Sequence, residues 1–250
     1  MTVVFVHGVP ETSAVWDGVR ALLTEESVAL VLPGFGVPRP AGFSATKDAY
    51  ADWLAGALER IEGPIDLVGH DWGALLTLRV ATAFTAPLRS WTVDVANNFH
   101  PASRWHPAAQ IWQTPGAGEQ RMRAAREAAP DDPDSFTARL IHNGVPTEQA
   151  HRMGAAHDET VSGCILDLYR SAMPNVYADW GAQATTATRA PGLVLLLPDD
   201  AEDEAMSLDV ARWLGARTDR LDGLDHCWMA QDPQAAVTAL RRFWRSLGDI

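Results

Sequence analysis

Short apolar runs alternate along the chain with longer stretches in which apolar residues recur every three or four positions. The short runs are rich in valine, isoleucine and leucine, and each ends at a turn or a glycine, as buried β-strands do. The longer stretches have the spacing of helices that bury one face. Repeated strand–helix units predict an α/β fold with a mostly parallel sheet flanked by helices. We expect strands at Val3–Val6, Val28–Leu32, Ile65–Val68, Ser90–Val95, Leu193–Leu197 and Thr218–Leu221, and helices at Ala45–Ile61, Ala74–Phe84, Leu208–Leu214 and Pro233–Leu247.

The alternation breaks once. From about Asn97 to Ala190 no buried-strand run occurs, and the sequence has a helical pattern interrupted repeatedly by prolines. We therefore expect a helical cap over residues 97–190, inserted between a first core part (1–96) and a second core part (191–250).

Composition narrows the class of protein. With 250 residues, 47% of them hydrophobic, the chain is long enough for one globular domain with an insertion. It carries 20 basic and 32 acidic residues, a formal charge of −12, which repels nucleic acids and anionic membranes. Cys164 and Cys227 are too few for a disulfide framework and lack the spacing of a zinc site. We expect a cytoplasmic protein without metal or other cofactor.

The candidate chemistry centres on Gly69-His70-Asp71-Trp72-Gly73, which follows the predicted strand Ile65–Val68 directly. A glycine-flanked residue at a sharp strand-to-helix turn is a nucleophile elbow, which leaves the central side chain exposed above the sheet. An aspartate there is ionised at pH 7 and attacks carbon directly, forming an ester. The structural alternative is an aspartate that caps the helix.

An ester on Asp71 has to be hydrolysed, which requires oxyanion donors and a base. The backbone N–H groups of Val9 and Trp72 are the expected donors, since Val9 follows the first strand in His7-Gly8-Val9-Pro10. His226, beyond the last strand, is the candidate base, although a buried structural histidine is the alternative. Asp199 and Asp200, at the end of the strand Leu193–Leu197, supply the acid that a triad needs.

Four elements together carry a resemblance that spans nearly the whole chain: His7-Gly8-Val9-Pro10-Glu11, Pro33-Gly34-Phe35-Gly36, the elbow at Asp71, and His226. They resemble α/β-hydrolases of the epoxide hydrolase and haloalkane dehalogenase branch, and most closely the epoxide hydrolases. The resemblance implies the α/β-hydrolase fold, a covalent ester on Asp71, His226 as base, and Asp200 rather than Asp199 as acid.

Two segments of the expected cap strengthen the resemblance. The segment Leu166-Asp167-Leu168-Tyr169-Arg170 is similar to the one whose tyrosine protonates the opening epoxide, and Gln113-Thr114-Pro115-Gly116 resembles a cap stretch of the same enzymes. The second cap tyrosine of that family is missing, and His106 is expected to take its place. Trp105 and Trp72 are expected to line the substrate site with it. The first two strands of the family are also absent or reduced, so the sheet should be small.

The function that the resemblance implies is hydrolysis of an epoxide to a vicinal diol. A small apolar organic molecule and water would be the partners, and a homodimer is left open. A haloalkane dehalogenase is the nearest alternative, but Val9 stands where many dehalogenases have asparagine, and Tyr169 would have no task. A binding protein on the same fold, without turnover, is the third alternative.

Overall fold

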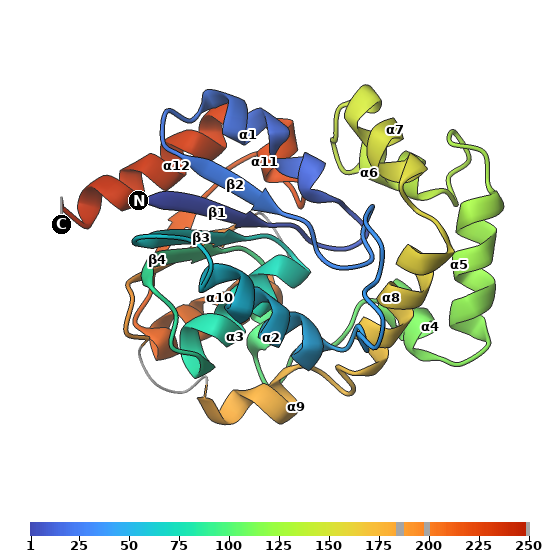
Figure 1. The fold of residues 1–250 in the computed structure, drawn as a ribbon, viewed down its shortest axis with the longest axis horizontal. Helices are drawn as coiled ribbons and strands as arrows, with labels where there is room; N and C mark the ends of the chain where they lie inside the picture. The colour runs from blue at the N-terminus through green and yellow to red at the C-terminus, as the bar shows by residue number, and fades with distance from the viewer. Residues whose placement is uncertain (184–187, 198–200, 249–250) are drawn as a thin grey trace.

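The computed structural model describes residues 1–183, 188–197 and 201–248. Its six strands form one parallel sheet in the order β2-β1-β3-β4-β5-β6 (Figure 1). Each predicted strand is present, with ends that differ from the prediction by no more than two residues. The α/β class with a parallel sheet is confirmed. The strands are β1 (Thr2–Val6), β2 (Ser27–Leu30), β3 (Ile65–Gly69), β4 (Leu88–Val93), β5 (Gly192–Leu196) and β6 (Arg217–Arg220).

The centre of the sheet brings two distant loops together. β1 pairs with β3 so that Val6 lies opposite Gly69, and both strands end at the same level. The loop that begins at His7 and the loop that begins at His70 therefore leave the sheet side by side.

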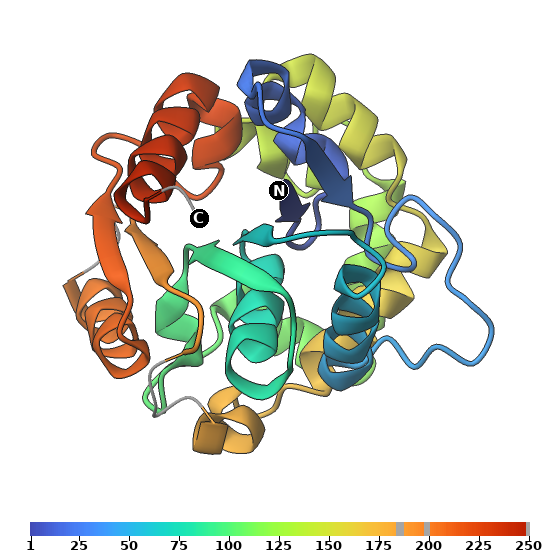
Figure 2. The same cartoon turned by 60° about the vertical axis from the view of Figure 1, so that its left-hand side comes forward.

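Helices cover both faces of the sheet (Figure 2). Because strand side chains alternate between faces, Val3 and Phe5 join the hydrophobic cluster beneath α1 (Asp17–Leu22), α11 (Trp228–Gln231) and α12 (Pro233–Ser246). Val4 and Val6 join the cluster beneath α2 (Lys47–Leu58), α3 (Trp72–Ala83) and α10 (Ala201–Leu214). The four predicted helices correspond to α2, α3, α10 and α12, while α1, a six-residue helix, was not predicted.

Between β4 and β5 the described residues form helices and turns only. The chain passes through a 3-10 turn (Ala96–Phe99), and α9 (Tyr177–Trp180) and a second 3-10 turn (Gly181–Gln183) complete the segment. The helices between them form a layer beyond the end of the sheet toward which the strands point (Figure 1). We call them the helical insertion: α4 (Pro107–Gln113), α5 (Ala117–Glu127), α6 (Phe136–His142), α7 (Thr147–Ala155) and α8 (Glu159–Arg170). Within the described ranges, no helix is both long enough and apolar enough to cross a membrane.

Candidate active site

Asp71 lies at the turn from β3 into α3 with a strained backbone, φ +51° and ψ −119°. The turn is tight, because a Cβ atom on Gly73 would collide with the backbone oxygen of Val6. Although Asp71 is the N-cap residue of α3, its side chain makes no capping hydrogen bond. The capping role considered for this aspartate is therefore wrong, and its carboxylate remains free for other partners.

The partner of that carboxylate comes from the loop after β1. The backbone N–H of Val9 donates to Asp71 Oδ1 at 2.8 Å. The loop approaches this closely because Gly8 has no side chain: a Cβ there would collide with the Cβ of Asp71 and lie 2.6 Å from its Oδ1. The expected oxyanion donor Val9 thus already contacts the candidate nucleophile.

Asp94, the first residue after β4, holds the elbow in place through hydrogen bonds. Its buried carboxylate accepts hydrogen bonds from the Asp71 backbone N–H at 2.9 Å, His70 Nδ1 at 2.5 Å and Trp228 Nε1 at 2.7 Å. Burial alone would raise the pKa of Asp94, but the His70 charge and the hydrogen bonds from His70 and Trp228 hold it below its usual value. Sequence reasoning placed Asp94 inside a strand and missed it. The signal was available, since it is an acid at the carboxyl end of a central strand.

Two histidines whose pKa values shift in opposite directions lie side by side, with the ring centroids of His70 and His226 4.7 Å apart. Burial would lower the pKa of His70, but the charge of Asp94 and its hydrogen bond hold that pKa well above the ordinary value. Burial and the charge of His70 lower the pKa of His226, while the charges of Asp71 and Asp94 act in the opposite direction. His226 is therefore neutral at pH 7 and able to accept a proton, as a base must be.

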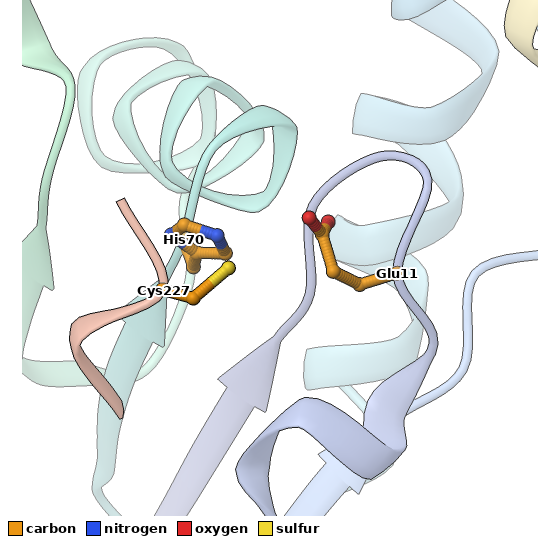
Figure 3. Close-up of side chains that lie close together, drawn as sticks. All are labelled: Glu11, His70 and Cys227. Atoms are coloured by element: carbon orange, nitrogen blue, oxygen red, sulfur yellow. The ribbon is translucent and has the colours of Figure 1, made fainter. Parts of the chain in front are cut away.

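The buried side chains of Glu11, His70 and Cys227 lie close together (Figure 3), with their candidate ligand atoms within 4.8 Å of one another. Burial raises the pKa of Glu11 to about 7, against the attraction of His70. Glu11 Oε2 and His70 Nε2 have no hydrogen-bond partner among the described residues. The three side chains are of types that bind metals. A cationic His70, however, has no lone pair on Nε2 with which to bind a metal. The cluster is therefore better suited to binding a proton on the Glu11 carboxylate than to binding a metal ion.

A cavity of about 360 Å³ lies between the elbow and the helical insertion, and Asp71, His226 and Tyr169 all line it. Tyr169, on α8, packs its ring 4.9 Å from that of Trp112. Burial, reinforced by the negative charge of Asp71, raises the pKa of Tyr169 well above its ordinary value. The phenol therefore keeps its proton, and Tyr169 can act as a hydrogen-bond donor to the cavity that it lines.

The other predicted substrate contacts are placed differently. His106 lines the cavity, and its Nδ1 also accepts the backbone N–H of Ala109 at the start of α4. Trp72 and Trp105 do not line it: their rings stack on each other at 5.4 Å, and Trp105 Nε1 donates to the Ala172 carbonyl oxygen. Both indoles are buried beside Tyr169 because they fill the space between α3 and the segments that follow β4. That these two indoles contact substrate stays a prediction.

The predicted acids Asp199 and Asp200 lie outside the described residues. The assignment of Asp200 to the triad therefore stays a prediction. The roles of Asp71, His226, Tyr169 and the Trp72 N–H also remain proposals.

Comparison with known proteins agrees with this architecture. The sequence matches the alpha/beta hydrolase family over residues 3–240. Its structure is similar to that of a protein from Pseudomonas aeruginosa described as a putative epoxide hydrolase, with a TM-score of 0.78, 19% identity, and coverage of 98% of this chain and 89% of the other.

Two further solved structures show the same fold. A variant of an epoxide hydrolase from Bacillus megaterium gives a TM-score of 0.76 at 17% identity, covering 98% of this chain and 93% of the other. A loop variant of a haloalkane dehalogenase from Bradyrhizobium elkanii gives 0.74 at 19% identity, covering 98% and 89%. No curated protein matches the sequence. Since the family match covers most of the chain and the parallel sheet, the elbow and the histidine after the last strand occur in the expected order, the chain belongs to the alpha/beta hydrolase family.

Proposed function

We propose that the protein is a hydrolase that opens epoxides through a covalent ester on Asp71 and releases a vicinal diol. The observation that carries the proposal is that Asp71, Tyr169 and His226 line one cavity. A carboxylate, a protonated phenol and a neutral imidazole around one space are the nucleophile, acid and base that this reaction needs.

In the first step, Asp71 attacks one carbon of the epoxide ring. Its Oδ1 is held by the Val9 N–H, while Oδ2 accepts no hydrogen bond from a described residue and is the oxygen available for attack. The new O–C bond forms as the ring C–O bond breaks. The departing oxygen takes the proton of Tyr169. The raised pKa of Tyr169 keeps its phenol protonated, so that it can donate this proton as negative charge develops on the ring oxygen.

In the second step, His226 takes a proton from water, and the hydroxide attacks the ester carbon of Asp71. The Val9 N–H lies where negative charge forms on the former Oδ1, which is the position of an oxyanion donor. Collapse of this intermediate releases the diol and restores the Asp71 carboxylate. The proton on His226 then returns through solvent to Tyr169, so the net reaction adds one water.

A haloalkane dehalogenase is the second candidate, and one observation favours it. Trp112 lines the cavity, and its buried indole N–H has no partner among the described residues. An unpaired N–H donor on a residue that lines the same cavity as the nucleophile suits a departing halide as well as an oxygen. Tyr169 would then have no oxygen to protonate, because a halide leaves as a stable anion.

The test is incubation with a panel of aryl and alkyl epoxides and haloalkanes, with diol and halide measured separately. We expect diol release, and accumulation of an adduct on Asp71 in His226→Gln, visible by intact mass, because alkylation does not need the base. Asp71→Ala is the control and should form none. Halide release without diol would select the second candidate, and an adduct on Cys227 or a serine would exclude Asp71 as nucleophile.

A further inference from the structure

One wall of the cavity is formed by helix α6 of the helical insertion. Arg139 and Asn143 lie one turn apart, and both line the cavity together with Leu140 between them. Residues four positions apart share a face of a helix, so the guanidinium and the amide are presented to the same space. Two more amides, Asn97 and Asn98, also line the cavity. Its lining therefore includes several side chains that can donate hydrogen bonds.

Arg139 is half-buried and unpaired. Its guanidinium forms no ion pair or hydrogen bond with any described residue. Asp134 is the carboxylate whose charge reaches Arg139, but it is already bonded to Arg121 at 2.7 Å. Burial and the charge of Arg121 lower the pKa of Arg139. A partly desolvated cation without a counter-ion is unfavourable in the empty protein and would gain from an anion that enters the cavity.

Two structural roles for Arg139 are weaker explanations. A cation in the last turn of a helix interacts favourably with the helix dipole, but His142 occupies the same turn at the surface, and such an interaction does not need burial in a cavity. Pairing with Asp71 is not supported either, since Asp71 is absent from the groups that shift the pKa of Arg139 most.

We propose that the substrate carries a carboxylate, which Arg139 binds with help from Asn143 while the reacting carbon faces Asp71. This inference rests on the proposed function, whose substrate class it narrows. A guanidinium presents two parallel N–H groups that match the two oxygens of a carboxylate, and the Asn143 amide supplies a further donor. The substrate expected is thus a small organic molecule with one anionic end, rather than a wholly apolar one.

A binding experiment tests the recognition separately from the chemistry. We would titrate the wild-type protein at pH 7.5 with phenylacetate and with phenylacetamide, which have the same shape but differ in charge. We expect phenylacetate to bind at least about tenfold more tightly, in the range of hydrogen bonds to charged groups. Arg139→Met should abolish that preference, and Arg139→Lys, which keeps the charge without the two-pronged geometry, should retain part of it. Arg123→Met removes an exposed charge of the same helical layer and should leave the preference unchanged.

A turnover experiment tests the same ratio with substrates. The pair is phenylglycidate and phenylglycidamide, and the readout is the ratio of their kcat/KM values. Wild type and Arg123→Met should prefer the carboxylate, mainly through KM, and Arg139→Met should bring the ratio toward one. An equal loss on both substrates would mean that Arg139 acts on Tyr169 instead, which overturns the proposal.

The outcomes separate this inference from the proposed function. If phenylacetate binds through Arg139 but no epoxide or haloalkane is turned over, the proposed reaction is wrong and the anion site stands. If epoxides are hydrolysed but charged and neutral ligands bind the wild type equally, the anion site is wrong and the reaction stands. Should Arg139→Met fail to fold by circular dichroism, Arg139→Lys alone decides, because an unchanged preference for phenylacetate over phenylacetamide in that variant contradicts the two-pronged contact.

Discussion

Asp71 combines a strained backbone with two hydrogen bonds to its neighbours, one at its backbone N–H and one at its side chain. A non-glycine residue at φ +51° costs on the order of 1–3 kcal/mol and persists only where the surroundings enforce it. The Asp94 carboxylate binds its N–H, and the Val9 N–H binds its Oδ1. These bonds fix both ends of the residue, so small changes nearby should affect reactivity more than stability.

Gly8→Ala tests that expectation. The added methyl group would collide with the Asp71 side chain and displace the carboxylate from Val9. Because a misplacement of about 1 Å can lower a rate about 10²-fold, we expect formation of the Asp71 ester to slow by about that factor. Single-turnover kinetics with an epoxide would measure it. Gly163→Ala on α8, where a Cβ meets no atom within 4 Å, is the matched control and should keep the rate. Equal rates in both variants would refute the close approach.

Tyr169→Phe removes one hydroxyl from the cavity wall with little change in volume. Loss of a single donor to developing negative charge typically costs about 10²–10³ in rate. We expect that loss in the alkylation step with epoxides, while breakdown of a preformed Asp71 ester stays nearly unchanged. Rapid-quench measurement of the two steps distinguishes them. Full epoxide turnover by Tyr169→Phe, combined with its loss in His106→Ala, would move the donor role to His106.

The local sequence identified the residues that form the elbow, but not the residues that pack around His70. The glycines around Asp71 and the strand before it are contiguous, so their pattern is readable. Asp94, Glu11 and Cys227 come from three separate segments, and only their packing shows that each lies next to His70. The stacking of Trp72 on Trp105 was not predicted for the same reason, since a local sequence does not say which face of an indole is covered.

At the scale of elements, the sheet was predictable because a buried parallel strand needs an uninterrupted apolar run. β6 was predicted although its side chains are mostly exposed, because the sequence before it and after it has the pattern of amphipathic helices. Helix α1 was missed because its six residues are too short to show a period. Strand ends were less certain than strand centres, and this explains how Asp94 was placed inside β4 when it lies just beyond it.

His7 joins the ends of two strands and should make their connection sensitive to acid. Its buried ring accepts the Leu32 N–H at Nε2 and bonds the Gly8 carbonyl through Nδ1, an arrangement that only neutral imidazole allows. Burial lowers its pKa to about 4, with the His70 charge acting in the same direction. The folded state therefore binds fewer protons than the unfolded state between about pH 6.5 and 4. The His7 contribution to the free energy of unfolding is present above pH 6.5 and is lost as the pH falls through this window.

The measurement is urea unfolding of wild type and His7→Gln at several pH values. We expect the unfolding free energy of wild type minus that of the variant to be constant above pH 7. By pH 4 this difference should fall by up to about 3 kcal/mol, from the linkage relation. Comparing two proteins that differ at one site cancels the titration of all other groups. A difference that does not vary with pH would show that the pKa of His7 is the same in the folded and unfolded states.

At the scale of the whole molecule, the helical insertion shares its hydrophobic cores with the sheet. One cluster joins Leu67 of β3 to Trp112 and Ile165 of the insertion. The cluster on the other face joins Phe5 of β1 to Leu140 of α6. Since neither cluster is confined to one part of the chain, the described residues of the insertion form no separate core, and opening the insertion would expose apolar surface on the sheet as well.

The two cysteines report on this coupling. Cys164 lies on α8 in the first cluster, and Cys227 lies beside the elbow in the second, and both are free and fully buried. If the insertion and the sheet unfold together, both thiols become reactive at the same urea concentration. We expect coincident midpoints when a short pulse of an alkylating reagent is applied along a urea titration and labelling of each cysteine is resolved by peptide mass spectrometry. Helix loss followed by circular dichroism should give the same midpoint. Labelling of Cys164 at lower urea than Cys227 would instead show that the insertion opens first, and the cavity would then be gated by an independent unit rather than held between two parts of one cooperative structure.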